Sequence, residues 1–386
     1  MEFSSAGSCF TGTNSYTLCK MRVVVDATPL LVRSAGVKNY LYHWIMHMRR
    51  AAGPAVIGTF PPLPHVRPLT HEASVAGPLR TFGGLAALGL SNHTPLPVLE
   101  LMTRDADIFH ASVLVRHPPR RARLTATVHD LTGFLMPELH PRANLVAESS
   151  FARLARRADR LIAVSECTRQ DAIRVLGIAP EKITTIHSGI ADAYFDPPVE
   201  SVDAVRLRYG LVRPFVLFVG TIEPRKNLDL LLDAFESLPL ALREHYQLVI
   251  AGPVGWNAEH TLKRLSMVRY LGYIPEPDLA PLTAAAEVFV YPSLYEGFGF
   301  PVAQAMAAGV PVITSNVSSL PEIAGAAALL VDPRSQSELH TALARLLTSP
   351  DLRISLAAAG RDRARAFRWQ ACAAKSLDFF RAVLGK

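Results

Sequence analysis

A glycine-rich turn that carries an acid is the part of this sequence best suited to chemistry. Residues 292–315 read PSLYEGFGFPVAQAMAAGVPVITS, in which Glu296 is followed by Gly297 and Gly299. Pro301 stands where a helix can begin and Gly309 where it can end. The free N–H groups and the positive dipole at such a helix start attract an anion, so the segment predicts a phosphate site. The alternative is that Glu296 only stabilises the helix dipole.

Two adjacent cations occur in a second segment, VGTIEPRKNLDLLL. Arg225 and Lys226 lie in the loop after an expected strand, and Asn227 is a suitable cap for the next helix. Neither cation falls on the apolar stripe of that helix, so we expect both to be free to reach a ligand. Two positive charges suit a diphosphate, whereas a solvated Arg-Lys pair is the alternative.

The other candidates give weaker signals. A small-residue turn ending at Gly36 follows the first expected strand and would allow close approach of a phosphate. His129 and Asp130 end a buried strand, where open α/β sheets bind ligands. The alternative there is a structural histidine with a capping aspartate. The segment Gly272–Ile274 offers a backbone edge that could contact a base.

Buried strands must bring these groups together. Short β-branched apolar runs alternate with helical patterns, and we expect strands at 22–26, 56–60, 107–110, 124–129, 160–164 and 183–187, and then at 215–220, 247–251, 288–291, 310–314 and 328–331. Continuous apolar character is typical of parallel strands covered on both faces. The alternation predicts a doubly wound α/β architecture with an open sheet in each half.

The chain is expected to divide into an N-terminal domain at 21–195 and a C-terminal domain at 196–366, with the linker near 192–200. Residues 367–386 have the pattern of an amphipathic helix. Residues 1–20 are polar and lack the apolar core of a signal peptide, so we expect a disordered extension. Residues 61–100 are rich in proline and glycine and are expected to form loops or short helices.

The composition excludes several classes of protein. Of 386 residues 49% are hydrophobic, but no apolar run approaches the ~18 residues of a transmembrane helix. The four cysteines form no CxxC motif, which suits a reducing compartment and argues against a structural metal. The motifs GxSxG, HExxH and GxxxxGK[ST] are absent, so nothing indicates a serine hydrolase, a zinc protease or a P-loop NTPase.

The net charge of +7, from 40 basic and 33 acidic residues, suits an anionic partner. One basic cluster consists of Arg116, Arg120, Arg121 and Arg123. It is either a solvated loop or a contact for a lipid or polyanion surface. No aromatic residues are interleaved with these arginines, so nucleic acid is not an expected partner.

Several segments resemble the retaining glycosyltransferases of family 4. Four segments resemble the C-terminal domain of this family: VGTIEPRKN, LGYI, YPSLYEGFGFPVAQAMAAGVPVITSNVSSLPEIAG and VDP. Four others resemble its N-terminal acceptor domain: VVVDATPL, AGVKNY, TVHDLTGFLMPELHP and AVSECTRQD. The resemblance implies the GT-B fold, in which two Rossmann-like domains face each other across a cleft and the C-terminal helix crosses back to the first domain. It also implies transfer of a sugar from a nucleotide donor with retention, without an essential metal or other cofactor.

The resemblance assigns roles to individual residues. Arg225 and Lys226 resemble the diphosphate clamp, and Glu296 resembles the first acid of the family's E-x7-E motif, which contacts the donor sugar. His129 resembles the histidine that contacts the sugar or supports the transition state. The expected donor site further contains Gly36, Gly220, Thr221, Gly272, Tyr273, Ile274, Gly297, Phe298 and Gly299, and the expected acceptor side contains Asn39, Tyr40 and Asp130.

Gln304 departs from the family pattern, which has a second glutamate at this position, usually bonded to the ribose. A neutral hydrogen bond contributes ~0.5–1.5 kcal/mol against ~1.5–3 kcal/mol for one to a charged group. The change predicts weaker donor binding and intact chemistry, because the ribose does not react.

Together these features predict a hexosyltransferase that uses a donor of the GDP-mannose or UDP-hexose type and a glycan or lipid-linked acceptor. The alternatives are a GT-B glycoside phosphorylase, and a nucleotide-sugar-binding protein weakened by Gln304. The expected location is the cytoplasm, with peripheral contact at the inner face of the membrane through the arginine cluster and the aromatic-basic helix at 40–50.

Overall fold

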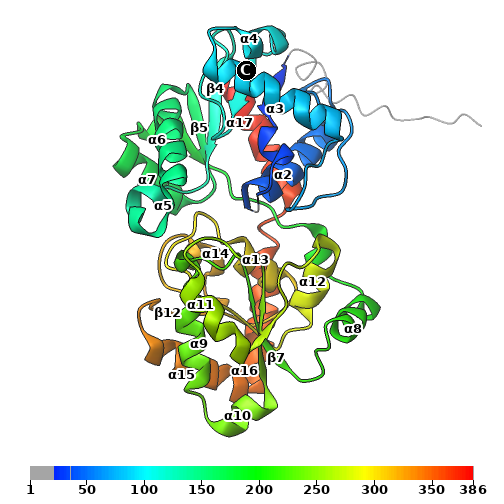
Figure 1. Ribbon diagram of the computed structural model, residues 1–386, viewed down its shortest axis with the longest axis vertical. Coiled ribbons are helices and arrows are strands. Elements are labelled where there is room, and N and C mark those ends of the chain that lie inside the picture. Colours follow the sequence, from blue (N-terminus) through cyan, green and yellow to red (C-terminus); the bar gives the residue numbers. More distant parts are fainter. Residues whose placement is uncertain (1–20, 35, 386) are drawn as a thin grey trace, which may run out of the picture.

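Two α/β domains are stacked along the long axis of the protein in the computed structural model, which describes residues 21–34 and 36–385 (Figure 1). The predictions for residues 1–20, including Cys9 and Cys19, fall outside the described residues. Each domain contains one six-stranded parallel sheet with helices around it. The predicted two-domain GT-B arrangement is therefore confirmed.

The first sheet has the strand order β2-β1-β3-β4-β5-β6. Its strands are β1 (Val23–Asp26), β2 (Ile57–Phe60), β3 (Ile108–Ala111), β4 (Arg123–Val128), β5 (Arg160–Ala163) and β6 (Ile183–Thr185). The helices of this part are η1 (Thr28–Leu31), α2 (Gly36–Ala52), α3 (Pro78–His93), α4 (Val98–Met102), α5 (Thr132–Leu135), η2 (Pro137–Leu139), α6 (Arg142–Arg157), α7 (Glu166–Leu176) and η3 (Pro180–Lys182). The central strands are buried on both faces, as their apolar sequences predict.

The second sheet has the order β12-β11-β10-β7-β8-β9. Its strands are β7 (Phe215–Val219), β8 (Gln247–Ala251), β9 (Arg269–Tyr270), β10 (Val288–Tyr291), β11 (Val312–Ser315) and β12 (Ala328–Val331). The helices are η4 (Asp192–Tyr194), α8 (Val199–Arg208), η5 (Pro224–Lys226), α9 (Leu228–Glu236), α10 (Leu240–His245), α11 (Glu259–Arg264), η6 (Leu265–Met267), α12 (Glu276–Ala284), α13 (Phe300–Ala307), α14 (Leu320–Ala324), α15 (Gln336–Thr348) and α16 (Pro350–Ala364). All eleven predicted strands are present, and only the two-residue β9 was missed.

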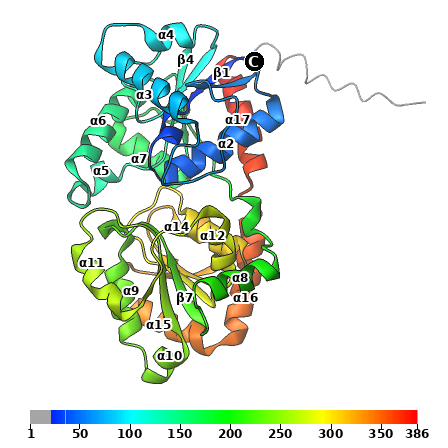
Figure 2. The same cartoon turned by 45° about the vertical axis from the view of Figure 1, so that its right-hand side comes forward.

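Helix α17 (Trp369–Val383) returns to the first domain and packs beside α2 (Figures 1 and 2). The indole Nε1 of Trp44 donates to Ser376 Oγ at 2.8 Å, and both residues are buried. At the crossing, the N–H of Ile190 donates to the carbonyl of Phe367 at 2.8 Å, so the two connections between the domains run side by side. The predicted crossover of the C-terminal helix is confirmed.

The packing of α2 corrects one prediction about membrane contact. Its aromatic and apolar side chains face α17 and the sheet, and Tyr40, Trp44 and Met48 are fully buried. Its last-turn Arg49 donates to the carbonyls of Ile57 and Leu63 inside the first domain. The aromatic-basic helix at 40–50 therefore cannot present its aromatic side to a membrane, and that part of the prediction is wrong.

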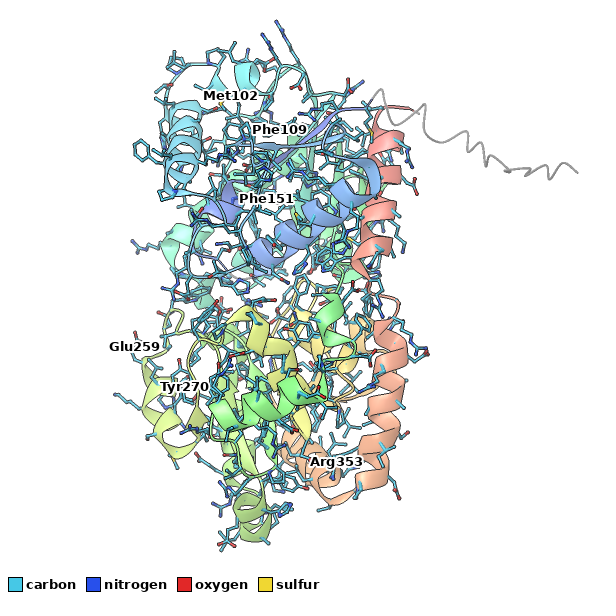
Figure 3. The ribbon with its side chains drawn as sticks, turned by 90° about the vertical axis from the view of Figure 1, so that its right-hand side faces the viewer. Met102, Phe109, Phe151, Glu259, Tyr270 and Arg353 are labelled. Atoms are coloured by element: carbon cyan, nitrogen blue, oxygen red, sulfur yellow. The ribbon has the colours of Figure 1, made fainter. Side chains whose placement is uncertain are left out.

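Side chains fill the interior of both domains (Figure 3). Phe109 and Phe151 lie inside the first domain, and Met102 lies near the end that is far from the second domain (Figure 3). Residues 61–100, which are expected from the sequence to form loops or short helices, contain the 16-residue helix α3 and the start of α4, so this expectation is wrong for residues 78–93. No helix among residues 21–34 and 36–385 is long and apolar enough to cross a bilayer.

Candidate active site between the two domains

The acid-bearing turn joins β10 to α13, as the sequence predicts. Gly299 has φ +89°, in the left-handed region that favours glycine, and it precedes the first helical residue. Pro301 is the second residue of α13, and Gly309, with φ +73°, follows its C-terminus. The helix therefore starts directly behind Glu296 and points its N-terminal N–H groups toward the turn.

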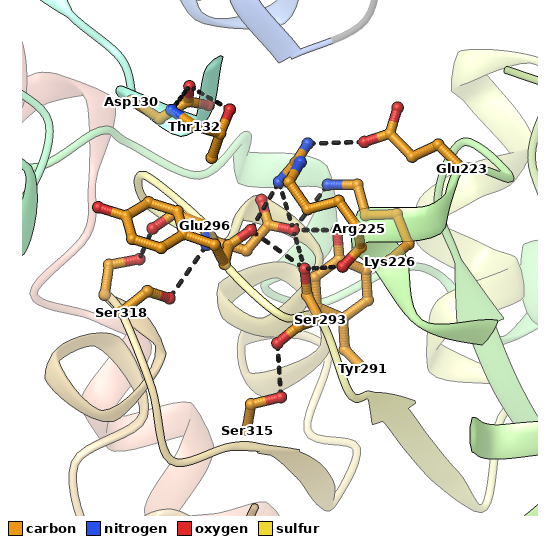
Figure 4. A network of polar contacts seen from close by, with 12 residues as sticks. Asp130, Thr132, Glu223, Arg225, Lys226, Tyr291, Ser293, Glu296, Ser315 and Ser318 are labelled. Atoms are coloured by element: carbon orange, nitrogen blue, oxygen red, sulfur yellow. Dashed lines mark hydrogen bonds and ion pairs between the residues drawn. The ribbon is translucent and has the colours of Figure 1, made fainter. Parts of the chain in front are cut away.

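Glu296 lies at the centre of a buried polar network (Figure 4). Its Oε1 accepts hydrogen bonds from Lys226 Nζ at 2.6 Å, Ser293 Oγ at 2.7 Å and the Tyr291 hydroxyl at 3.0 Å. Burial by itself would raise the pKa of Glu296, but the charges of Arg225 and Lys226 outweigh it and hold the pKa at about 2. Glu296 is therefore a carboxylate at neutral pH and cannot act as a proton donor there.

Arg225 and Lys226 do not extend into open solvent, which corrects the expectation that both are free. An Nη1 atom of Arg225 lies 3.1 Å from Glu296 Oε1, and its Nη2 donates to Glu223 Oε1 at 2.7 Å (Figure 4). Two cations thus face two carboxylates in a site with no net charge. The buried Nε of Arg225 has no hydrogen-bond partner among the described residues, so it can still donate to a ligand.

Asn227 ties the cationic loop to the acid-bearing turn. It occupies the predicted N-cap position of α9, but its side chain makes no capping hydrogen bond. Instead its Nδ2 donates to the carbonyls of Pro292 at 3.1 Å and Pro333 at 2.7 Å. This contact explains how two segments 70 residues apart meet at one point.

The turn also contacts the first domain. A Cβ atom placed on Gly297 would lie 1.7 Å from the carbonyl oxygen of His129 and 3.0 Å from Asp130 Cβ. Thr168 Oγ1, at the start of α7, donates to the carbonyl of Gly297 at 3.1 Å. The structure therefore brings the predicted donor residues of one domain against the predicted His129 of the other.

His129 follows the last residue of β4. Its ring packs edge-on against Tyr40, with ring centroids 4.8 Å apart. Burial lowers the pKa of His129 to about 4, although Asp130 partly opposes this effect, so the imidazole is neutral at pH 7. Asp130 Oδ1 accepts from the N–H and the hydroxyl of Thr132. Asp130 therefore holds the turn before α5 through Thr132, and it also lines the cavity described next.

A cavity of about 170 Å³ lies at the carboxyl ends of β1, β3 and β4, and its polar lining consists of Asp26, His110, Ser112, Thr127, His129, Asp130 and Glu148. Glu148 is a lining residue that was not predicted from the sequence. Its Oε2 accepts from the Gly133 N–H at 2.9 Å, and burial together with Asp130 raises the pKa of Glu148 to about 7. The sequence does carry one signal for Glu148. It stands at helical spacing from Phe151, Ala152 and Ala155, which are buried on α6, so its side chain is expected on the same inward face.

The predicted acceptor residues are only partly brought together. Asp130 lines the cavity, whereas Tyr40 is fully buried behind His129 and positions its ring. Asn39 does not line the cavity. Gly36 begins α2 with no atom within 4 Å of a Cβ placed on it, so the space in front of this helix start is open.

The predicted base-binding segment lies next to the loop after β7. Gly252 donates to the carbonyl of Gly272 at 2.7 Å, and a Cβ on Gly252 would lie 1.9 Å from the carbonyl oxygen of Gly220. The backbone of Gly252 therefore lies against both Gly272 and Gly220, which brings these two predicted donor residues close together. Ile274 is buried in the core, so only its backbone could contact a ligand, while Tyr273 is half-buried. Thr221 packs closely against Gly255: a Cβ atom placed on Gly255 would lie 2.7 Å from Thr221 Cγ2.

Two further predicted donor residues lie on α13 or next to it. The Phe298 side chain is buried against Phe367, with ring centroids 5.6 Å apart, so only its backbone is available near a phosphate. Gln304 lies in the second turn of α13 and is half-buried. Within the described residues its side-chain amide makes no hydrogen bond, which leaves it available to a ligand.

Glu322 is an interdomain residue that was not predicted from the sequence. It lies on α14 of the second domain, yet its carboxylate accepts from the N–H of Glu166 at 2.8 Å and of Cys167 at 3.1 Å. It also contacts His187 Nε2 at 2.6 Å. An acid from one domain therefore caps helix α7 of the other, a favourable position for negative charge.

Among residues 21–34 and 36–385, no three His, Cys, Asp or Glu side chains gather as a metal-binding group would require. The described cysteines, Cys167 and Cys372, are both free. The polar site thus consists of cations, carboxylates, hydroxyls and backbone N–H groups.

Comparison with known proteins supports a relationship in both halves of the chain. A family model described as Glycosyltransferase Family 4 matches residues 34–194, and one described as Glycosyl transferases group 1 matches residues 210–363. The chain is 35% identical over 275 residues to O-antigen chain mannosyltransferase B of Escherichia coli, which covers 69% of this chain and 72% of that protein. It is 27% identical over 299 residues to the serotype-specific mannosyltransferase WbdA of Escherichia coli, covering 74% of this chain but 36% of WbdA.

Solved structures share the fold. Sucrose-phosphate synthase from Thermosynechococcus elongatus superposes with a TM-score of 0.71 at 21% identity, over 95% of this chain and 99% of that one. Anabaena HepE in complex with UDP and glucose superposes with a TM-score of 0.70 at 18% identity, over 94% and 100%. From the matches to both halves and the 35% identical relative, we conclude that this protein belongs to the group 1 glycosyltransferases of family 4.

Proposed function

We propose that this glycosyltransferase moves a mannosyl group from a nucleotide diphosphate sugar of the GDP-mannose type to a hydroxyl group of a glycan or lipid-linked acceptor, with retention and without an essential metal. The names of two relatives, O-antigen chain mannosyltransferase B and mannosyltransferase WbdA, support mannose and a polysaccharide product. The observation that carries the proposal is the contact of Glu296 with Lys226 and Arg225 in front of α13, next to Gly297, whose backbone lies against the carbonyl of His129.

The leaving diphosphate would be stabilised by charge. Arg225 and Lys226 pair with Glu223 and Glu296, and a diphosphate would offer these cations a more highly charged partner. The free Nε of Arg225 and the N–H groups at the start of α13 add donors. Preorganised donors of this kind favour a transition state in which negative charge grows on the leaving oxygen.

The sugar would lie between Glu296 and His129. As the bond from the anomeric carbon to the phosphate oxygen breaks, the sugar gains positive character, which the Glu296 carboxylate stabilises. The acceptor oxygen bonds to the anomeric carbon from the same face, and its proton passes to the departing phosphate oxygen. The neutral imidazole of His129 can hydrogen-bond the sugar without adding a repelling charge.

The acceptor would occupy the cavity on the other side of His129. Asp130 Oδ1 and Glu148 Oε2 are held by backbone N–H groups, which leaves the second oxygen of each carboxylate for sugar hydroxyls. Carboxyl groups suit this task because their oxygens accept hydrogen bonds from hydroxyl groups, and Glu148, whose pKa is raised to about 7, can also donate one in its protonated form.

The test is turnover of GDP-mannose, compared with UDP-glucose and UDP-N-acetylglucosamine, using methyl α-D-mannopyranoside as acceptor, with and without a chelator. Glu296→Gln should lower kcat by at least about 100-fold while GDP still binds, because one preorganised electrostatic group is lost. The matched control is Glu259→Gln on the exposed start of α11 (Figure 3). The anomeric configuration of the product, measured by NMR, tests retention.

Three results would contradict the proposal. Near-normal turnover by Glu296→Gln would remove the assigned role of the acid. Release of mannose 1-phosphate from a glycan and inorganic phosphate, without nucleotide, would identify a phosphorylase. Binding of GDP-mannose with no turnover toward any acceptor or water would identify a binding protein.

A further inference from the structure

Helices α3 and α4 expose an unusual number of large apolar side chains. Leu79 is 89% exposed, Phe82 is 78% exposed and Leu101 is 67% exposed, and Leu90, Leu96 and Met102 are exposed as well. Leu79, Phe82, Ala86 and Leu90 follow one another at helical spacing on the outer side of α3, while Gly84 and Leu88 face inward. Contiguous apolar surface of this kind marks a site of interaction with another molecule or with a membrane.

The arginine cluster adjoins this apolar face. The side chain of Asn92, near the end of α3, bonds the carbonyl of Leu114 and the N–H of Arg116. Glu100, on α4, accepts from the N–H of Arg120 at 2.6 Å and pairs with Arg121 at 3.5 Å. The loop that carries the arginines is therefore fixed beside the two helices. Arg123, the first residue of β4, does not belong to this surface, because its side chain pairs with Asp159.

The charge of this surface is positive. Residues 73–121 contain five arginines, namely Arg80, Arg104, Arg116, Arg120 and Arg121, against three acids. Each acid is engaged with the protein, because Glu100 bonds the arginine loop and Asp105 and Asp107 bond Arg22. Within the described residues, Arg80, Arg104, Arg116 and Arg120 have no ion-pair partner. The surface thus combines exposed apolar side chains with uncompensated cations.

We propose that the outer face of α3 and α4, together with the loop at 114–121, docks the protein on an anionic lipid bilayer. The apolar side chains would enter the boundary between headgroups and acyl chains, and the arginines would contact the lipid phosphates. Charge complementarity selects this occupant over a second copy of the chain, since two such faces would place their arginines against each other. Figures 1 and 2 show α4 at the end of the first domain farthest from the second, so docking there leaves the interdomain site uncovered.

The test is flotation of the full chain with vesicles of phosphatidylcholine alone and of phosphatidylcholine mixed with phosphatidylglycerol. We expect binding to the mixed vesicles only, falling as salt rises, because exposed charges are screened. Leu79→Ser combined with Phe82→Ser should reduce binding at least about tenfold, by removing inserted apolar groups. Arg116→Gln combined with Arg120→Gln should reduce it about thirtyfold, at ~1 kcal/mol per arginine, and flatten the salt dependence.

Matched controls are Leu207→Ser on α8 and Arg345→Gln on α15, both exposed and both in the second domain. These variants should bind vesicles like the unmodified protein. Absence of flotation with the mixed vesicles, or binding that survives the Leu79→Ser, Phe82→Ser change, would overturn the proposal. The proposal would also be overturned if sedimentation showed a dimer of the unmodified protein that the Leu79→Ser, Phe82→Ser change converts to a monomer, and if the protein did not bind vesicles. The readout is lipid binding, so its outcome is independent of donor and acceptor identity.

Discussion

Gly297 of the second domain lies against the carbonyl oxygen of His129 in the first, so closely that a Cβ at position 297 would come within 1.7 Å of that oxygen. The two nearest atoms, the carbonyl oxygen and carbon of His129, belong to the backbone, which cannot rotate away as a flexible side chain could. Glycine at this position therefore sets how near the two halves of the site can come. Its φ lies outside the left-handed region, so the requirement is one of space rather than of backbone conformation.

We expect Gly297→Ala to hold the two domains apart. The kcat/KM for transfer should fall at least about 100-fold, since a misplacement of ~1 Å suffices for such a loss. The dissociation constant of GDP, measured by calorimetry, should change far less, because the cationic loop and α13 remain in one domain. Gly83→Ala on α3, where a Cβ meets no atom within 4 Å, is the control. Normal turnover by Gly297→Ala would show that the site does not need this contact.

Gln304→Glu introduces the acid that the family resemblance implies at this position. Because the Gln304 amide has no partner among the described residues, the change disrupts no existing hydrogen bond. A charged acceptor strengthens a ribose contact by about 1 kcal/mol, which corresponds to about fivefold tighter GDP binding. Titration of GDP against both proteins measures this, with the exposed Gln336→Glu variant as control. Unchanged or weaker binding would mean that residue 304 does not contact the ribose.

Glu322→Gln tests the contact between α14 and α7. The amide keeps one acceptor oxygen but loses the charge that faces the α7 N–H groups and His187. We expect a larger radius of gyration by small-angle scattering and about tenfold lower kcat/KM, because hydrogen bonds to charged groups contribute ~1.5–3 kcal/mol. Glu181→Gln, exposed on η3, provides the comparison. If the scattering curve does not change, the carboxylate does not hold the domains together.

His110 predicts sensitivity to acid. Burial, assisted by His129, lowers the pKa of His110 to about 3, from 6.5 in the unfolded chain. Below pH 6.5 the unfolded chain binds a proton that the folded protein excludes. The stability that this histidine contributes is therefore complete above pH 6.5 and is lost as the pH falls toward 3.

The corresponding measurement is urea unfolding between pH 4.5 and 7. His110→Asn should reduce the slope of stability against pH by up to about 1.4 kcal/mol per pH unit. His245→Asn, exposed at the end of α10, should leave the slope unchanged. An equal slope for His110→Asn and the unmodified protein would show that His110 is protonated in the folded state.

The sequence predicted the strands well because burial on both faces leaves a continuous apolar run, as in Val23–Asp26 and Phe215–Val219. It also predicted α13, whose Pro301 and Gly309 are local signals. It could not predict that Lys226 pairs with Glu296, because nothing local encodes a contact between residues 70 positions apart.

Other errors have the same origin. Tyr40 was expected beside the acceptor, but α17 covers that side of α2 and Tyr40 packs inward. Glu148 was not predicted because its role depends on contacts made in the folded protein. The N–H of Gly133 donates to its carboxyl group, and the charge of Asp130 helps to raise its pKa. The two-residue β9 is too short to produce a pattern, and α3 carries apolar residues on both its inner and outer sides, which hides its period.

The return of α17 to α2 also has a consequence for biosynthesis. On the ribosome, the first domain is made early, but its core cannot close until residues 369–383 have been translated, after the entire second sheet. Until then, the side of Trp44 that later meets Ser376 and Phe380 has no partner. The domain that emerges first is thus the one completed last, and a nascent chain stopped before residue 369 would expose an aromatic surface of the kind that chaperones bind.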